Sequence, residues 1–165
     1  MTDIAVEVGP GTAPFLPHLN EELVVLGSTV VYVERDKGAA RLLLGVEEDS
    51  IVVLGLAEHL GLKSNSAEVV VLPNVWGVLS GGGILKALPE IVRVVKPSGR
   101  VVVVETAGPV PLEDVMASMQ VQGLKLEREY LGKEGILEIF NDRKLAEDLV
   151  DGFGSGCYAA VFRKP

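Results

Sequence analysis

The chain has few cysteines, few aromatic side chains and no excess of positive charge. Its single cysteine, Cys157, cannot form an internal disulfide, and no Cys/His cluster has the spacing of a zinc site. Fifteen Lys and Arg residues stand against 23 Asp and Glu residues, which gives a formal net charge of −8. Binding to nucleic-acid phosphates needs the opposite balance. We therefore expect no metal site and no direct nucleic-acid partner.

Long apolar runs are also missing, and we expect no leader peptide. No stretch approaches the roughly 18 apolar residues of a membrane span, and the first residues are acidic and apolar rather than basic. These features predict a soluble, cytoplasmic protein with no membrane partner. The 165 residues fit a single domain, because no repeat or linker divides them.

Short aliphatic runs dominate what is present. Valine and leucine supply most of the 48% apolar residues, which favours strands buried on both faces of a sheet. These runs alternate with helical patterns, as in parallel βα units, and right-handed crossovers then favour a doubly wound α/β sheet with helices on both faces. Strands are expected at 4–8, 29–33, 51–54, 68–72, 100–105, 126–131 and 157–163, and helices at about 13–26, 37–44, 84–95, 112–122 and 143–150.

A glycine-rich turn follows the first expected strand. Gly9 permits a tight turn, and Gly11 allows a ligand to approach the backbone closely. Glu34 ends the second strand, where a carboxylate can accept hydrogen bonds from both hydroxyls of a ribose. Together these features predict a nucleoside ligand at the carboxyl ends of the strands. The alternative is that the glycines serve only a tight turn and that Glu34 is a solvated strand end.

A dinucleotide is the less favoured nucleoside ligand. A dinucleotide fingerprint has a third glycine where this chain has Pro14, and proline offers no N–H group to a pyrophosphate. Tyr130 and Lys133 are one residue too close for the Tyr-x-x-x-Lys pair of hydride-transfer enzymes. An NAD(P)-binding protein therefore remains the weaker alternative.

With these residues in view, the chain resembles a Rossmann-like class I S-adenosylmethionine-dependent methyltransferase that acts on a small molecule or a protein. Residues 7–13 are similar to the acidic-x-Gly-x-Gly-x-Gly turn of that family, with Ala13 for the third glycine, and Glu34 resembles its ribose-binding acid. The resemblance covers residues 4–131, with the last strand fitting at 157–163. Three further segments also resemble the family: the adenine loop at 53–60, the fourth strand and its exit at 67–74, and the helix and turn before the fifth strand at 88–100.

The resemblance implies a three-layer αβα fold around seven strands in the order 3-2-1-4-5-7-6, with the last strand antiparallel. It also implies S-adenosylmethionine as cofactor, S-adenosylhomocysteine as its product, and a transferase reaction. The cofactor-binding residues that it implies are Glu7, Gly9, Pro10, Gly11, Thr12, Glu34, Arg35, Leu56, Ala57, Glu58, Pro73 and Asn74.

Two departures from the family pattern affect these expectations. Leu56 stands where many members have an acid that binds the adenine amino group, which leaves backbone groups, apolar contact or Glu58 for that role. Many relatives also have covering helices before the first strand, whereas here that strand begins at about residue 4. Residues 132–156 are long for a strand connection. We expect this segment to form a lid, alone or with a partner subunit or a second copy in a homodimer; the alternative is an ordinary helical insert.

The sequence shows no obvious acid–base pair. A methyl sulfonium is a strong electrophile, so alignment of the nucleophile can supply most of the rate. The candidate catalytic residues are Asn74 and Trp76, just beyond the fourth strand, and His18; the alternatives are a turn former, a core side chain and a surface histidine. Residues 80–83 are either a nest for an anionic group or a hinge. A non-catalytic binding or scaffold subunit is the alternative to an enzyme.

Overall fold

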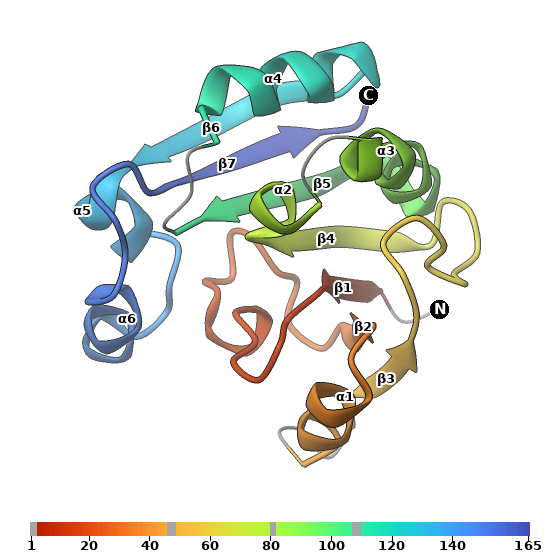
Figure 1. Cartoon of the computed structure of the whole chain (residues 1–165), viewed down its shortest axis with the longest axis horizontal. Helices are drawn as coiled ribbons and strands as arrows, with labels where there is room; N and C mark the ends of the chain where they lie inside the picture. Colours follow the sequence, from red (N-terminus) through yellow and green to blue (C-terminus); the bar gives the residue numbers. More distant parts are fainter. Residues whose placement is uncertain (1–2, 46–48, 80–81, 107–109) are drawn as a thin grey trace.

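A computed structural model describes residues 3–45, 49–79, 82–106 and 110–165 of the chain (Figure 1). Its centre is one seven-stranded sheet with the order β3-β2-β1-β4-β5-β7-β6. Strand β7 is antiparallel to both of its neighbours, and the pairings among β1 to β5 are parallel. The predicted fold class is therefore confirmed. The strands are β1 (Ile4–Val8), β2 (Thr29–Glu34), β3 (Ile51–Leu54), β4 (Ala67–Pro73), β5 (Val95–Glu105), β6 (Lys125–Leu131) and β7 (Tyr158–Arg163).

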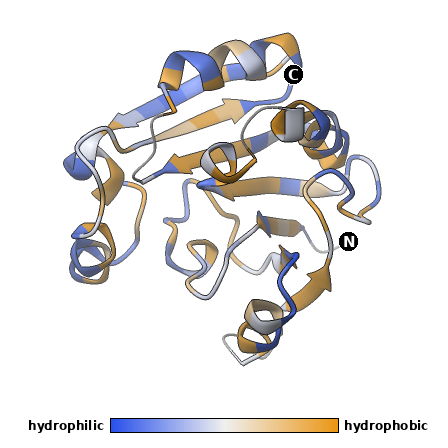
Figure 2. Cartoon of the chain, in the orientation of Figure 1, coloured by the Kyte–Doolittle hydropathy of each residue, from blue (hydrophilic) through white to orange (hydrophobic). Residues whose placement is uncertain are grey.

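Helices cover both faces of the sheet because its central strands are apolar on both sides (Figure 2). One core layer joins the sheet to α2 (Val75–Val78), α3 (Gly82–Val94) and α4 (Leu112–Val121). The other joins it to α1 (Lys37–Leu43), α5 (Gly132–Leu137) and α6 (Arg143–Val150). In the described part of the chain, no helix has the length and apolar character that a membrane crossing requires.

The prediction of a helix at 13–26 is wrong. Only a single 3₁₀ turn, η1 (Leu16–His18), forms in this segment. The prolines explain the difference: Pro14 and Pro17 lack N–H groups, and each disfavours helical geometry in the residue before it. The segment instead runs as a loop that buries Phe15, Leu16, Leu19 and Leu23 against the sheet.

Residues 132–156 pack against this loop. Leu19 forms an antiparallel bridge with Phe140, and the Asn20 amide donates to the Ile139 carbonyl at 2.8 Å. The rings of Phe15 and Phe140 meet edge to face, with 5.9 Å between their centroids. The insertion between β6 and β7 therefore fills the layer in which the first helix was expected.

This packing predicts that Phe140→Ala destabilises the protein strongly. Phe140 is buried, and removing its ring leaves a cavity between the loop and the insertion, with an expected loss of about 3–5 kcal/mol in the free energy of unfolding. Urea denaturation measures this loss, and Leu131→Ala is the control because Leu131 is 60% exposed. Equal losses in the two variants would contradict the packing.

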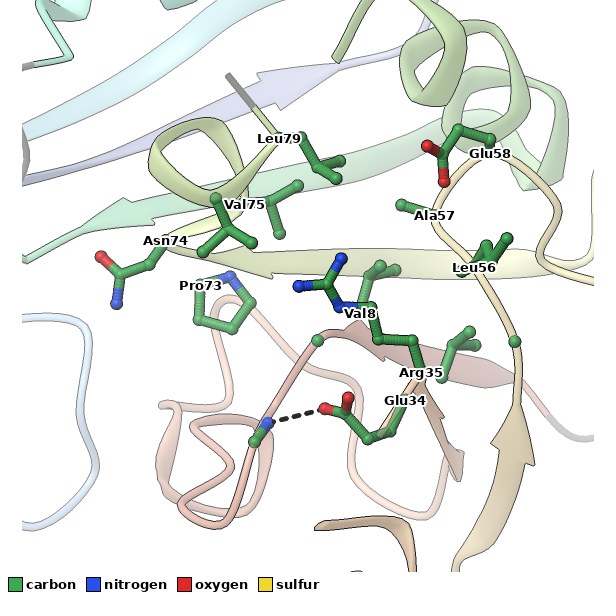
Figure 3. Close-up of a pocket in the computed structure, with 15 residues that line it drawn as sticks. Val8, Glu34, Arg35, Leu56, Ala57, Glu58, Pro73, Asn74, Val75 and Leu79 are labelled. Carbon is green, nitrogen blue, oxygen red and sulfur yellow. Dashed lines mark hydrogen bonds between the residues drawn. The ribbon is translucent and has the colours of Figure 1, made fainter. Parts of the chain in front are cut away.

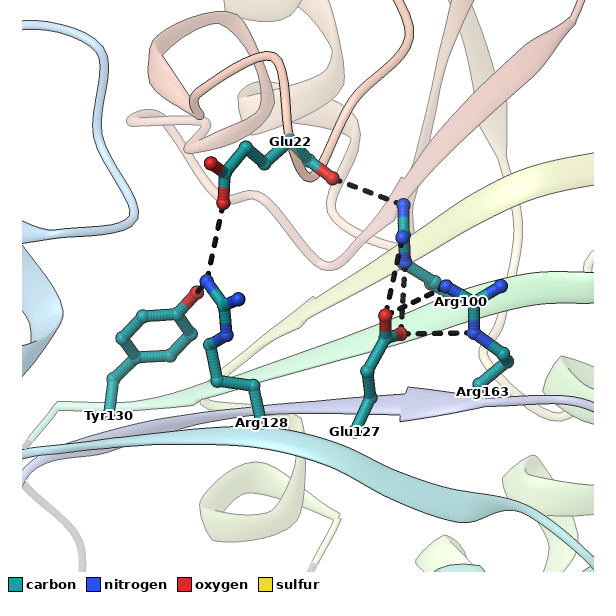
Figure 4. A network of polar contacts seen from close by, with 6 residues as sticks. All are labelled: Glu22, Arg100, Glu127, Arg128, Tyr130 and Arg163. Carbon is teal, nitrogen blue, oxygen red and sulfur yellow. Dashed lines mark hydrogen bonds and ion pairs between the residues drawn. The ribbon is translucent and has the colours of Figure 1, made fainter.

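A partly exposed ion-pair network joins β5, β6 and β7 (Figure 4). The carboxylate of Glu127 accepts hydrogen bonds from the guanidinium groups of Arg163, at 2.7 Å, and Arg100, at 3.0 Å. These bonds, from Arg163 first and Arg100 second, lower the pKa of Glu127 to about 2. Arg128 donates to Glu22 and to the hydroxyl of Tyr130, which ties β6 to the loop before β2.

We expect Glu127→Gln to change how stability depends on pH. The folded-state pKa lies below the ordinary value, so the stabilisation is complete above about pH 5 and is lost as the pH falls toward 2. Because the network is partly exposed, its expected contribution at pH 7 is only about 1 kcal/mol. Unfolding measured from pH 7 to pH 2, with Glu129→Gln as control, should show the variant and the wild type converging in acid. A difference in stability between the wild type and Glu127→Gln that stays constant from pH 7 to pH 2 would contradict this prediction.

Candidate functional site

A pocket of about 180 Å³ lies at the carboxyl ends of β1, β2, β3 and β4 (Figure 3). Its floor comes from the glycine turn after β1 and from the end of β2, and its sides come from the loop after β3 and from α2. This is the edge at which open α/β sheets bind ligands. Its lining consists of Val8, Gly9, Gly11, Val33, Glu34, Arg35, Gly55, Leu56, Ala57, Glu58, Pro73, Asn74, Val75, Val78 and Leu79.

The glycine turn and the carboxylate of Glu34 lie together in this pocket. Gly9 and Gly11 have φ angles of 68° and 60°, a left-handed conformation that favours glycine. Glu34 is 5% exposed, and one of its oxygens accepts from the Gly11 amide at 3.0 Å (Figure 3). The other oxygen accepts from the Asp36 amide at 2.9 Å. A Cβ on either glycine would meet no protein atom within 4 Å, so the space beside the turn is open to a ligand.

Glu7 anchors the loop that follows the glycine turn. It is fully buried, and its two carboxylate oxygens accept from the Phe15 amide at 2.9 Å and from the Leu16 amide at 2.8 Å. Both bonds lead into the loop beyond the turn. The structure therefore places Glu7 outside the pocket lining, together with Pro10 and Thr12, although the family resemblance implied that all three contact the cofactor.

The loop after β3 forms one side of the pocket, with Leu56 52% exposed at its mouth. Two residues of α3 hold this loop. Glu90 accepts from the Leu60 amide at 3.0 Å, and Arg93 donates to the Leu62 carbonyl at 2.8 Å. Arg93 also pairs with Glu90, and this hydrogen bond is the main cause that lowers the pKa of Glu90.

Helix α2 forms the opposite side of the pocket with Val75 and Val78, followed by Leu79 (Figure 3). No helix was predicted here, because a four-residue helix has too few residues to show a period.

Glu105, at the end of β5, is the functional candidate that sequence reasoning did not select. Its only signal is a lone charge after four consecutive valines.

Among the predicted catalytic residues, the structure brings only Asn74 into the pocket lining. Asn74 has a left-handed φ of 54°, and its side-chain oxygen accepts from both the amide and the hydroxyl of Thr106. Trp76 is 6% exposed and packs in the core, and His18 lies in η1. Residues 80–81 of the predicted nest lie outside the described residues. The described lining contains no residue of 132–156, whose role as a lid stays a prediction.

Comparison with known proteins agrees with this geometry. A family model described as a methyltransferase domain matches residues 6–103, more than half of the chain. This chain belongs to the class I S-adenosylmethionine-dependent methyltransferases. The matched region contains the glycine turn, Glu34, both sides of the pocket and α3, so it includes every described residue of the pocket lining.

Individual methyltransferases show the same relationship. An uncharacterized methyltransferase of Mycobacterium tuberculosis (strain ATCC 25618 / H37Rv) is 30% identical over 95 residues, which are 58% of this chain and 36% of that protein. The chain thus spans about a third of the length of this relative. The TehB-like methyltransferase of Corynebacterium glutamicum has a TM-score of 0.71 at 21% identity, with 99% of this chain and 80% of that chain covered.

A third similar protein is a methyltransferase of Haloferax volcanii solved in complex with the Trm112 methyltransferase activator. It has a TM-score of 0.71 at 13% identity, and the match covers 99% of this chain and 83% of that chain. At these low identities, the two structural matches show that this methyltransferase chain has the same fold as its neighbours.

The attachment of the β3 loop predicts that Glu90→Ala loosens one side of the methyltransferase pocket. The Leu60 amide is buried and would lose its acceptor, which should cost about 1–3 kcal/mol of unfolding free energy and speed hydrogen exchange at Leu60. Glu147→Ala is the matched control, because it removes an exposed ion pair with Arg143 and should change stability little. Unchanged exchange at Leu60 in Glu90→Ala would show that this bond does not hold the loop.

Proposed function

We propose that this chain binds S-adenosylmethionine in the described pocket and transfers its methyl group to a small-molecule or protein acceptor. The observation that carries the proposal is the convergence of the Gly11 amide and the Glu34 carboxylate, 3.0 Å apart, at the carboxyl edge of the sheet. The chemistry of the residues fits the cofactor. The turn offers backbone beside open space, Glu34 offers acceptor oxygens, and the sides of the pocket are apolar.

Each part of the cofactor has a matching region of the pocket. The turn at Gly9 and Gly11 would hold the methionine part. Glu34 would accept hydrogen bonds from the ribose hydroxyls; since each carboxylate oxygen has two lone pairs, its bonds to the Gly11 and Asp36 amides leave acceptor sites. The adenine would lie between residues 56–58 and α2, mostly in apolar contact, because Leu56 supplies no acid.

The cofactor, when bound, supplies a methyl group on a positively charged sulfur that is already electrophilic. The chain therefore has to bind, orient and exclude water rather than provide strong acid or base catalysis. Asn74 is the pocket residue placed to orient the acceptor, because Thr106 fixes its side-chain oxygen and thereby the direction of its amide group. Its amide N–H groups would donate to the acceptor.

The second candidate function is a non-catalytic cofactor-binding or scaffold subunit. One observation favours it: Leu56 lines the pocket without supplying an acid for the adenine amino group, so that the cofactor has fewer polar partners. The H. volcanii methyltransferase, which is bound to an activator protein, is a precedent for a partner subunit. Under this alternative, a partner subunit or second copy would complete the site. Calorimetry with S-adenosylmethionine and S-adenosylhomocysteine, followed by transfer of labelled methyl groups to a panel of amines, thiols, carboxylates and peptides, distinguishes the two functions.

The binding proposal predicts that Glu34→Ala weakens S-adenosylhomocysteine binding by about 1–3 kcal/mol, because the ribose hydroxyls lose a charged acceptor. This loss corresponds to a dissociation constant about 5- to 150-fold higher in calorimetry.

Asp36→Ala provides the matched control. Asp36 follows Glu34 closely and caps α1 through the Ala39 amide, so its removal should cost about 1 kcal/mol of stability with no change in affinity. An absence of binding by the wild-type protein, or equal affinities of wild type and Glu34→Ala, would overturn the proposed cofactor site.

A further inference from the structure

Helix α2 depends on a carboxylate that lies outside the pocket. The helix has only four residues, Val75–Val78, yet two of them line one side of the pocket. Such a short helix has little stability of its own, because nucleation is unfavourable and few helical bonds follow. Contacts from the rest of the fold must therefore hold it in place.

Glu105 supplies the polar part of these contacts. It ends β5, is 2% exposed, and accepts hydrogen bonds from the amides of Trp76, at 3.2 Å, and Gly77. Both amides belong to the first turn of α2, where no helical partner exists for them. The carboxylate thus takes the place of the capping side chain that Asn74 does not provide.

The surroundings of Glu105 contain acids and aromatic groups. Tyr158 of β7 lies opposite it in the sheet, and the Tyr158 hydroxyl donates to the Val110 carbonyl. Burial raises the pKa of the Tyr158 hydroxyl, and the negative charges of Glu105 and of Asp114 and Glu113 in α4 raise it further. Thr106 and Asn74, at the ends of their strands, are neutral. Among the described residues, no cation contributes to the ionisation of Glu105.

We propose that Glu105 is a positioning residue for the cofactor pocket: its ionised carboxylate holds α2 by two backbone amides and so keeps the Val75–Val78 side of the pocket in place for binding. This inference rests on the proposed cofactor site. It assigns to Glu105 no contact with the cofactor or the acceptor, because its effect passes through the backbone of α2.

The protonation state of the Glu105 carboxylate changes near neutral pH. Burial raises the pKa of Glu105 to about 7, and the two amide hydrogen bonds act against that rise. Below this pH the carboxyl group gains a proton, and its hydroxyl oxygen becomes a poor acceptor for the second amide. A pocket that needs the ionised form therefore binds more weakly as the pH falls from 8 to 6. With one proton linked to binding, the change over this interval is at most about tenfold.

The test is the affinity for S-adenosylhomocysteine at pH 6, 7 and 8, measured by calorimetry on the wild type and on Glu105→Gln. We expect the wild type to bind about three- to tenfold more weakly at pH 6 than at pH 8. Glu105→Gln should bind weakly at both values with a flat profile. Glu105→Gln leaves His18 and His59 in place, so a difference between the two profiles reports Glu105. Glu113→Gln is the control, because it alters a nearby exposed acid and should keep the wild-type profile.

Two results would overturn the inference: a flat wild-type profile, or the same slope in the wild type and in Glu105→Gln. If the variant does not fold, ¹³C NMR of the wild-type carboxyl groups replaces it. Binding of S-adenosylhomocysteine should lower the apparent pKa of the carboxyl that titrates near neutrality, and an unchanged value would overturn the inference. Failure to bind at pH 8 would instead overturn the proposed cofactor site, so the two failures are distinguishable.

Discussion

The loops around the pocket depend on one repeated interaction, a carboxylate that accepts backbone amides from a neighbouring segment. Glu7, Glu34 and Glu105 stand at or near the ends of strands, are each at least 95% buried, and each accept two amides. Glu90 does the same for the loop after β3 with one amide. A buried charged acceptor that loses its donors costs more than a neutral one. The geometry of the loops is therefore fixed by the strands and by α3 rather than by the loops themselves.

This arrangement explains how a site forms without the first helix. The prolines prevent a helix after the glycine turn, yet Glu7 holds Phe15 and Leu16, and the insertion at 138–141 pairs with the loop beyond them. The layer that a helix would occupy is thus filled from the far end of the chain. The two glycines keep their left-handed conformation beside open space.

The sheet could be predicted from the sequence because each strand carries its own signal, such as the four valines at 101–104. The glycines and Glu34 could also be placed, since their positions follow from the strand ends. The rest depended on tertiary contacts. A helix was expected at 13–26, where Pro14 and Pro17 prevent it, and α2 is too short to have a period. The partner of Glu105 lies 29 residues earlier in the chain, at Trp76, so sequence spacing gave no indication of that bond.

A crystal structure of the complex with S-adenosylhomocysteine tests the proposed cofactor site most directly. We expect both ribose hydroxyls to lie within hydrogen-bond distance of the Glu34 carboxylate, with the adenine between residues 56–58 and α2. A ligand bound elsewhere, or a ribose out of reach of Glu34, would contradict the proposed site.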